Sequence, residues 1–182
     1  MKIFVIAQAL GILGMAINVF SFQAKKQRTI ILMQLFGSAL FAANMLMIGA
    51  VTGGILNTIG IFRAFVYSNK DKIKNLKIWN IIFITLFVLS YFLAFFVAEK
   101  EANILNITVE ILPVLAMIAT TVSFAKTKAA SVRKLGLVSS PLWLVYNIIN
   151  LSIGGILCEV FNLISIVTAI LRLYLHKSTD GV

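Results

Sequence analysis

Residues 78–98 read IWNIIFITLFVLSYFLAFFVA, a nearly unbroken run of aliphatic and aromatic side chains. The run is interrupted only by three uncharged polar residues, Asn80, Thr85 and Ser90. Lys77 precedes it and Glu99 follows it. A helix of this length covers roughly 30 Å, the thickness of the hydrocarbon core of a bilayer. The run has no counterpart elsewhere in the chain and separates two blocks that resemble each other, so it predicts a linker helix between two repeats.

The composition of the chain identifies it as a membrane protein. Of its 182 residues, 60% are hydrophobic and only 12% are charged. A water-soluble domain of this length could not bury that much apolar surface, so lipid must solvate much of it. The apolar runs are long and do not alternate with period two, which favours helices over a barrel. We therefore expect an all-α polytopic membrane protein.

The apolar runs predict seven transmembrane helices, at residues 3–22, 30–48, 54–68, 78–98, 104–124, 135–151 and 156–175. Glycine-rich turns are expected at residues 49–53 and 152–155. These elements divide the chain into four parts: a first three-helix repeat at 1–68, a basic loop with the linker helix at 69–102, a second three-helix repeat at 103–177, and a polar tail at 178–182.

The basic residues predict the orientation of the chain in the membrane. With seven spans, nearly all of them fall on one side: Lys25, Lys26, Arg28, Lys70, Lys72, Lys74, Lys77, Lys126, Lys128, Arg133, Lys134, Arg172 and Lys177. The other side carries Lys2 and Lys100. Because lysine and arginine concentrate in cytoplasmic loops, the N-terminus is expected outside and the C-terminus in the cytoplasm.

An internal repeat accounts for the odd number of spans. Gln8 aligns with Glu110, Asn44 with Asn147 after one insertion, and the sequence GGIL at residues 53–56 with GGIL at residues 154–157. Two copies of three spans joined directly would point in opposite directions across the membrane. A single helix between them restores the same direction, which gives two parallel three-helix bundles. Parallel repeats with a site between them are a known plan of transporters.

This three-plus-one-plus-three plan resembles the SWEET and PQ-loop architecture. Over nearly its whole length the chain also resembles the family of bacterial inner-membrane proteins typified by YgjV. The motifs that carry this second resemblance are AQALG at residues 7–11, Ser21-Phe22, ILN at 55–57, EILP at 110–113, and SIGG at 152–155 followed by Glu159. The resemblance implies a SWEET-like fold and a transport role.

The SWEET resemblance also implies residues that contact a solute. Such sites use an asparagine on the third helix of each repeat and a tryptophan on the second, and the matches here are Asn57, Asn162 and Trp143. An aromatic belt at the membrane surface is the competing interpretation of Trp143. The chain departs from the pattern elsewhere. The Pro-Gln pairs of the PQ-loop family are replaced by Phe22-Gln23 and Phe124-Ala125, and no second tryptophan matches Trp143.

Two acidic residues fall inside predicted spans, Glu110 and Glu159. A carboxylate at the centre of a spanning helix costs about 2.5–3.5 kcal/mol on insertion scales, so such residues usually face the protein interior. We interpret them as groups that tune or couple a site, with Gln8 matching Glu110 in the first repeat. A packing role for each carboxyl group is the alternative.

Amide and arginine side chains in the spans have competing interpretations. Asn44 and Asn147 are assigned to the solute-contacting set, although hydrogen bonding between helices is a common alternative role for such residues. Arg63 and Arg172 lie near the predicted cytoplasmic ends of their helices, and we expect them to extend to the lipid headgroups.

These observations predict a SWEET-like facilitator that moves a small polar solute, such as a sugar or vitamin, by alternating access. The alternative is a receptor or assembly factor of the same fold that transports nothing. The sequence contains no Cys-His metal spacing, glycine-rich phosphate loop or Ser-His-Asp set, so no enzyme, metal or cofactor is expected. The expected partners are the bilayer and the solute; a homo-oligomer stays open, and no nucleic acid is expected. The expected location is the bacterial inner membrane.

Overall fold

The computed structural model describes residues 2–21, 24, 26–97, 100–126 and 129–179. These residues form seven α-helices and one short 3-10 turn, which confirms the all-helical prediction. The helices are α1 (Lys2–Ser21), α2 (Gln27–Met47), α3 (Val51–Ser68), α4 (Leu76–Val97), α5 (Ile104–Ala125), α6 (Ala129–Ile149) and α7 (Ile153–Thr179), and the turn η1 is Lys70–Lys72.

The surface of the bundle is apolar and its interior contains polar groups. Phe96 and Ile104 are 82% and 85% exposed, whereas the polar residues Asn44 and Thr52 are fully buried. This is the reverse of the pattern in a water-soluble protein. Within the part of the chain that the structure describes, four helices are long and apolar enough to cross a membrane: α1, α2, α4 over Leu76–Leu93, and α5. Lipid is therefore the natural solvent of the outer surface.

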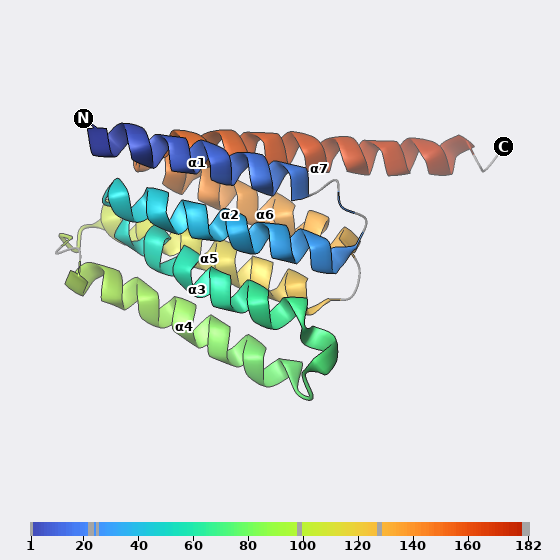
Figure 1. Cartoon of the computed structure of the whole chain (residues 1–182), viewed down its shortest axis with the longest axis horizontal. Helices are drawn as coiled ribbons and strands as arrows, with labels where there is room; N and C mark the ends of the chain where they lie inside the picture. The colour runs from blue at the N-terminus through green and yellow to red at the C-terminus, as the bar shows by residue number, and fades with distance from the viewer. Residues whose placement is uncertain (1, 22–23, 25, 98–99, 127–128, 180–182) are drawn as a thin grey trace.

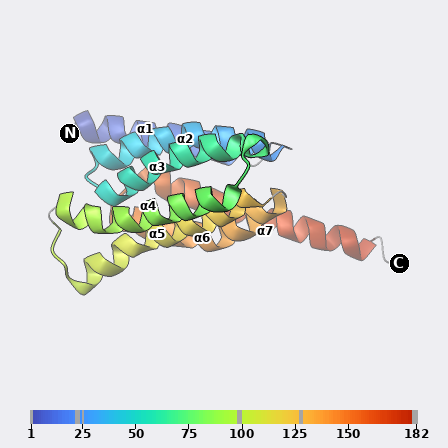
Figure 2. The ribbon, with the colours of Figure 1, turned by 90° about the horizontal axis from the view of Figure 1, so that it is seen from below.

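Six helices form a closed ring, and α4 lies outside it. The contacts run from α1 to α2, α3, α5, α6 and α7, and α7 contacts α1 again. The main contacts of α4 are with α3 and α5. In Figure 1 the helices run side by side with α4 at one edge, and Figure 2 shows the same bundle from below. The helix at the centre of the sequence is thus peripheral in space.

The contact between α1 and α7 closes the ring through main-chain atoms. A Cβ placed on Gly154 would overlap the main-chain carbonyl group of Gly11. Glycine is needed here because any side chain would force the two helices apart. The sequence predicted that Gly53 and Gly154 form turns, and this prediction was wrong, because both lie in the first turn of a helix. Their role is close packing rather than chain reversal.

The two turns at this end of the bundle share one capping geometry. After α2, Gly49 has φ +82°, and the N–H of Ala50 donates to the carbonyl of Met45. After α6, Leu151 has φ +54°, and the N–H of Ser152 donates to the carbonyl of Asn147. Both are Schellman caps with a left-handed residue. The same cap therefore ends the second helix of each predicted repeat.

The basic loops meet at the opposite end of the bundle. Lys70 donates from Nζ to the carbonyl of Lys126 at 2.6 Å and to Oε1 of Gln27 at 2.8 Å. Arg28 reaches Oδ1 of Asn69 at 3.4 Å. These bonds join the start of α2 to the loops after α3 and α5, so these predicted basic segments lie at one end of the bundle. Lys25 and Lys128 lie outside the described residues, as do the side chains of Arg133, Arg172 and Lys177.

Helix boundaries differ most where the sequence is basic. A loop was expected through residue 134, but α6 begins at residue 129. Alanine, lysine and arginine in this segment are good helix formers, so the helix extends beyond its apolar part. Likewise, α7 continues past the end of the other helices (Figure 1). Hydropathy therefore marks the apolar core of a helix better than its ends.

Candidate functional site

A polar cavity lies at the centre of the six-helix ring. It contains about 120 Å³ of space for small groups. Every ring helix contributes to its lining, and none of the described lining residues comes from α4. The polar and charged lining residues are Asn18, Gln34, Ser38, Asn57, Arg63, Thr120, Ser123, Ser139, Ser140, Asn147, Glu159 and Asn162. This arrangement can surround a small polar molecule with hydrogen-bonding groups while lipid covers the outside.

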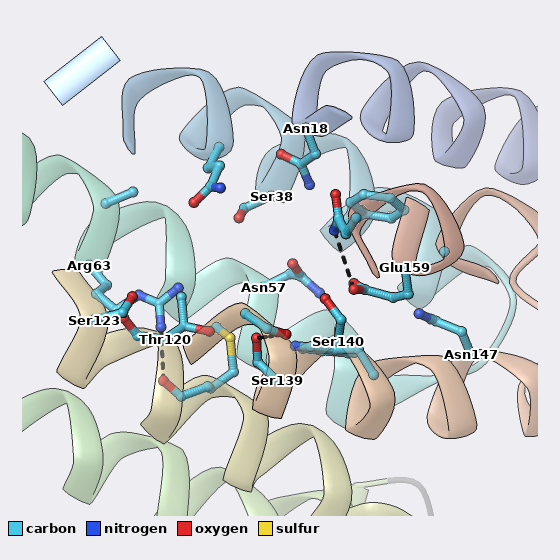
Figure 3. A pocket seen from close by; sticks show the side chains of 18 of the residues that line it. Asn18, Ser38, Asn57, Arg63, Thr120, Ser123, Ser139, Ser140, Asn147 and Glu159 are labelled. Carbon is cyan, nitrogen blue, oxygen red and sulfur yellow. Dashed lines mark hydrogen bonds between the residues drawn. The ribbon is translucent and has the colours of Figure 1, made fainter. Parts of the chain in front are cut away.

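Arg63 forms one end of the cavity, next to Thr120 and Ser123 (Figure 3). Its side chain is only 4% exposed, and Nη1 donates to the carbonyl of Met117 at 3.0 Å. The guanidinium carbon lies 4.8 Å from the ring centroid of Phe124, in cation–π contact. The expectation that Arg63 extends to the headgroups was therefore wrong. Aromatic rings and backbone carbonyls in the interior replace its contact with water.

Glu159 marks the other end of the cavity, next to Asn147 (Figure 3). Asn162, one turn further along α7, donates from Nδ2 to Oε2 of Glu159 at 3.3 Å. The same Nδ2 lies 3.6 Å from Sγ of Cys158. The 3- and 4-residue spacings place these side chains on one face of α7. That face presents a carboxylate and an amide to the cavity.

Asn57 projects into the middle of the cavity, near Ser139 and Ser140 (Figure 3). Its Nδ2 donates to the carbonyl of Gly53 in its own helix at 2.9 Å. That bond fixes the orientation of the amide and leaves Oδ1 free to accept. Trp143 lies one turn beyond Ser139 on α6 and also lines the cavity, with its ring edge-on to Tyr146.

Five of the residues predicted to form the site line this cavity: Asn57, Trp143, Asn147, Glu159 and Asn162. They come from α3, α6 and α7, which are distant in sequence. Three other predicted residues, Gln8, Asn44 and Glu110, are buried but do not line it. The structure gives each of these three a contact elsewhere.

Gln8 and Asn44 tie the first half of the chain to the turn between α6 and α7. Gln8 donates to the carbonyl of Leu151 and accepts from the N–H of Ile153, both at 3.0 Å. Asn44 donates to the carbonyl of Ala7 at 2.8 Å and accepts from the hydroxyl of Ser152 at 2.7 Å. Since these bonds join α1, α2 and the start of α7, they support the seam that closes the ring.

Glu110 pairs with Lys100, which lies in the connection between α4 and α5. The carboxylate is 1% exposed, whereas the lysine is 24% exposed. One carboxylate oxygen, Oε1, contacts the ammonium group, and Oε2 has no partner. A buried carboxylate without a counter-ion is costly, so Lys100 stabilises this end of the bundle.

Several lining residues gave no clear signal in the sequence. Ser38, Ser139 and Ser140 are small, and serines in apolar helices commonly bond to their own backbone. Asn18 is polar and lies within an apolar run, as Asn57 does. The difference is that no family resemblance pointed to Asn18.

The fold and the cavity together define a polytopic helical membrane protein with a polar interior site. The model of the Imp-YgjV family, described as bacterial inner membrane protein, matches residues 5–177. The chain belongs to this family, which confirms the expected membership and places the protein in a bacterial inner membrane. A search of curated proteins and a search of solved structures each found no match. The SWEET and PQ-loop architecture stays a prediction.

Proposed function

We propose that this protein is a seven-span carrier, rather than an enzyme, that moves a small polar solute across the inner membrane by alternating access. The observation that carries the proposal is the polar cavity, which is lined by all six ring helices and, among the described side chains, by none of α4. A site between two groups of helices is what a carrier requires, because each opening must reach the same bound solute. The sugar- or vitamin-like solute expected from the SWEET resemblance is the starting hypothesis.

The proposal includes spans at α3, α6 and α7. Asn57 and Arg63 lower the mean hydropathy of α3, whereas α6 and α7 contain apolar stretches at Lys134–Ile149 and Ile153–Thr168 within the described residues. A spanning helix that faces a polar cavity need not be apolar on every side. The ring order supports two parallel triplets, α1–α3 and α5–α7, with α4 as the helix that restores direction. The bundle ends fit an N-terminus outside and a C-terminus in the cytoplasm, because the basic loops lie with the end of α7.

Within this proposal Asn57, Asn162, Trp143 and Asn147 contact the solute, and Glu159 tunes or couples its binding. Asn44, Gln8 and Glu110 act indirectly, through the seam between α1 and α7 and through the ion pair with Lys100.

Proteoliposome uptake of radiolabelled sugars, nucleosides and amino acids tests the proposal. Asn57→Ala should reduce uptake at least tenfold, because the amide faces the cavity. Asn150→Ala is a matched control: Asn150 also donates to a carbonyl of its own helix at 2.9 Å, that of Tyr146, but does not line the cavity. Equal uptake by the two variants would contradict the assigned site. A solute that binds but is never transported would favour the receptor alternative.

A further inference from the structure

Among the described residues, the cavity contains one cationic and one anionic side chain, and neither is paired with a counter-ion. Arg63 supplies a guanidinium group and Glu159 a carboxylate. Across the described ranges the structure records one ion pair, and it joins Lys100 to Glu110. Arg63 donates instead to a backbone carbonyl and to the hydroxyl of Thr121. Two opposite charges therefore face the same space without neutralising each other.

The two charges lie at different ends of the cavity. In Figure 3, Arg63 is beside Thr120 and Ser123, Glu159 is beside Asn147, and Asn57 lies between them. Because α3 carries the cation and α7 the anion, a bound solute would contact both halves of the chain.

We propose that the solute is a small zwitterion of the amino-acid type, whose carboxylate binds Arg63 and whose ammonium group binds Glu159. The inference rests on the proposed carrier function and narrows its substrate class. A zwitterion compensates both charges and adds no net charge to the interior. A neutral sugar compensates neither, and a simple anion or cation leaves one of them unpaired in a poorly solvated site.

The polar atoms without partners at each end suit the charge that would bind there. At the cationic end, Nε of Arg63 is a buried donor without a partner, which suits a carboxylate. At the anionic end, Oδ1 of Asn147 and Oδ1 of Asn162 are buried acceptors without partners. Both asparagines are more than nine-tenths buried. An ammonium group has three donors, which matches one carboxylate and two amide oxygens.

The volume of the cavity limits the solute to a small molecule. About 120 Å³ of space lies among the lining side chains, which suits a solute of the size of a small amino acid.

The full-length protein in lipid nanodiscs allows a direct test by calorimetry. The probes are the twenty common amino acids, the amide of each, the corresponding hydroxy acids, and glucose. An amide lacks the carboxylate charge, and a hydroxy acid lacks the ammonium group. At least one amino acid should bind tenfold or more tightly than both of its analogues, because each charge-assisted contact contributes about that factor.

Two neutral variants assign each charge to its partner. In Arg63→Gln the preferred amino acid and its amide should bind equally, because the carboxylate has lost its partner. In Glu159→Gln the amino acid and its hydroxy acid should bind equally. A residue with a merely structural role would weaken all three compounds together and leave their ratios unchanged. Asn150→Ala should preserve the wild-type ratios.

The other possible outcomes distinguish the carrier function from the zwitterionic substrate. If glucose or another uncharged compound binds and no amino acid does, the zwitterion inference is wrong and the carrier function stands. If nothing binds and nothing is transported, both are wrong. Should Arg63→Gln fail to fold, Arg63→Lys retains the charge and should still prefer the amino acid over its amide, and a loss of that preference would contradict the assignment.

Discussion

The main-chain contact between α1 and α7 gives a sharp prediction for Gly154→Ala. The added Cβ would overlap the main-chain carbonyl of Gly11, and a helix backbone cannot move aside as a side chain can. Overpacking costs about 1–3 kcal/mol, and a rigid neighbour places this site at the upper end. Alanine recovers about 1 kcal/mol of helix propensity. The free energy of unfolding should therefore fall by about 2 kcal/mol.

Gly60→Ala is the matched control for this change. A Cβ on Gly60 would lie 3.0 Å from the terminal methyl group of Met117, which is flexible and can move, and in ordinary contact with Oγ of Ser38 at 3.7 Å. The gain in helix propensity should then raise the unfolding free energy by up to about 1 kcal/mol.

Reversible unfolding in SDS, followed by circular dichroism, measures both variants. The two free energies should differ by about 3 kcal/mol, the sum of the expected loss and gain. Gly154→Ala should also impair solute binding, because the cavity depends on a closed ring. If both variants were equally stable, α1 and α7 would not be in main-chain contact, and the six-helix ring would be refuted.

Three further predictions concern the turns, the ion pair and the topology. Leu151→Gly should raise stability by up to about 1 kcal/mol and Gly49→Leu should lower it by a similar amount in the same SDS titration, since a left-handed residue with a side chain is strained. Lys100→Met should lower stability by about 1–3 kcal/mol by leaving the Glu110 carboxylate unpaired, and adding Glu110→Gln should recover part of the loss in a double-mutant cycle. With the native cysteine replaced by serine, a cysteine at position 100 should react with a membrane-impermeant maleimide in intact cells, whereas one at Lys74 should not; the reverse labelling would contradict the orientation.

The helical architecture was largely predictable because it follows from solvation. Long apolar runs must be helical in lipid, and charged residues such as Lys77 delimit them, so all seven helices were located from hydropathy and charge. Gly53, Gly154 and Gly155 were misassigned to turns because glycine permits both a chain reversal and close helix packing. The contact between Gly154 and Gly11 distinguishes these two roles, and it joins residues that are far apart in the sequence.

The site was predictable in part for a similar reason. Charged residues inside apolar runs usually face the protein interior, which singled out Glu159. Asn57 and Asn162 were assigned to the site through the SWEET resemblance. Asn44 was also assigned to the site, but its amide bonds to neighbouring helices outside the cavity. Whether a buried polar side chain faces the cavity or a neighbouring helix depends on the rotation of its own helix about its axis. The direction of the Arg63 side chain was predicted wrongly. A residue near the end of a helix can extend outward to the lipid headgroups or inward to the protein interior, and the sequence does not distinguish the two.

The closure of the ring by its first and last helices has a consequence for biosynthesis. Chains are made from the N-terminus at roughly 5–20 residues per second, so α7 emerges on the order of ten seconds after α1. Until then the nascent bundle lacks α7, so its ring of helices is open. The side chains of Asn18 and Asn57, which line the cavity in the complete protein, are not yet covered by α7. A protein that binds the nascent chain transiently, such as the membrane-insertion machinery, would shield these amides from lipid during that interval. Ribosome-bound chains that stop before α7 should therefore be caught by crosslinkers placed at Asn18, and full-length chains should not.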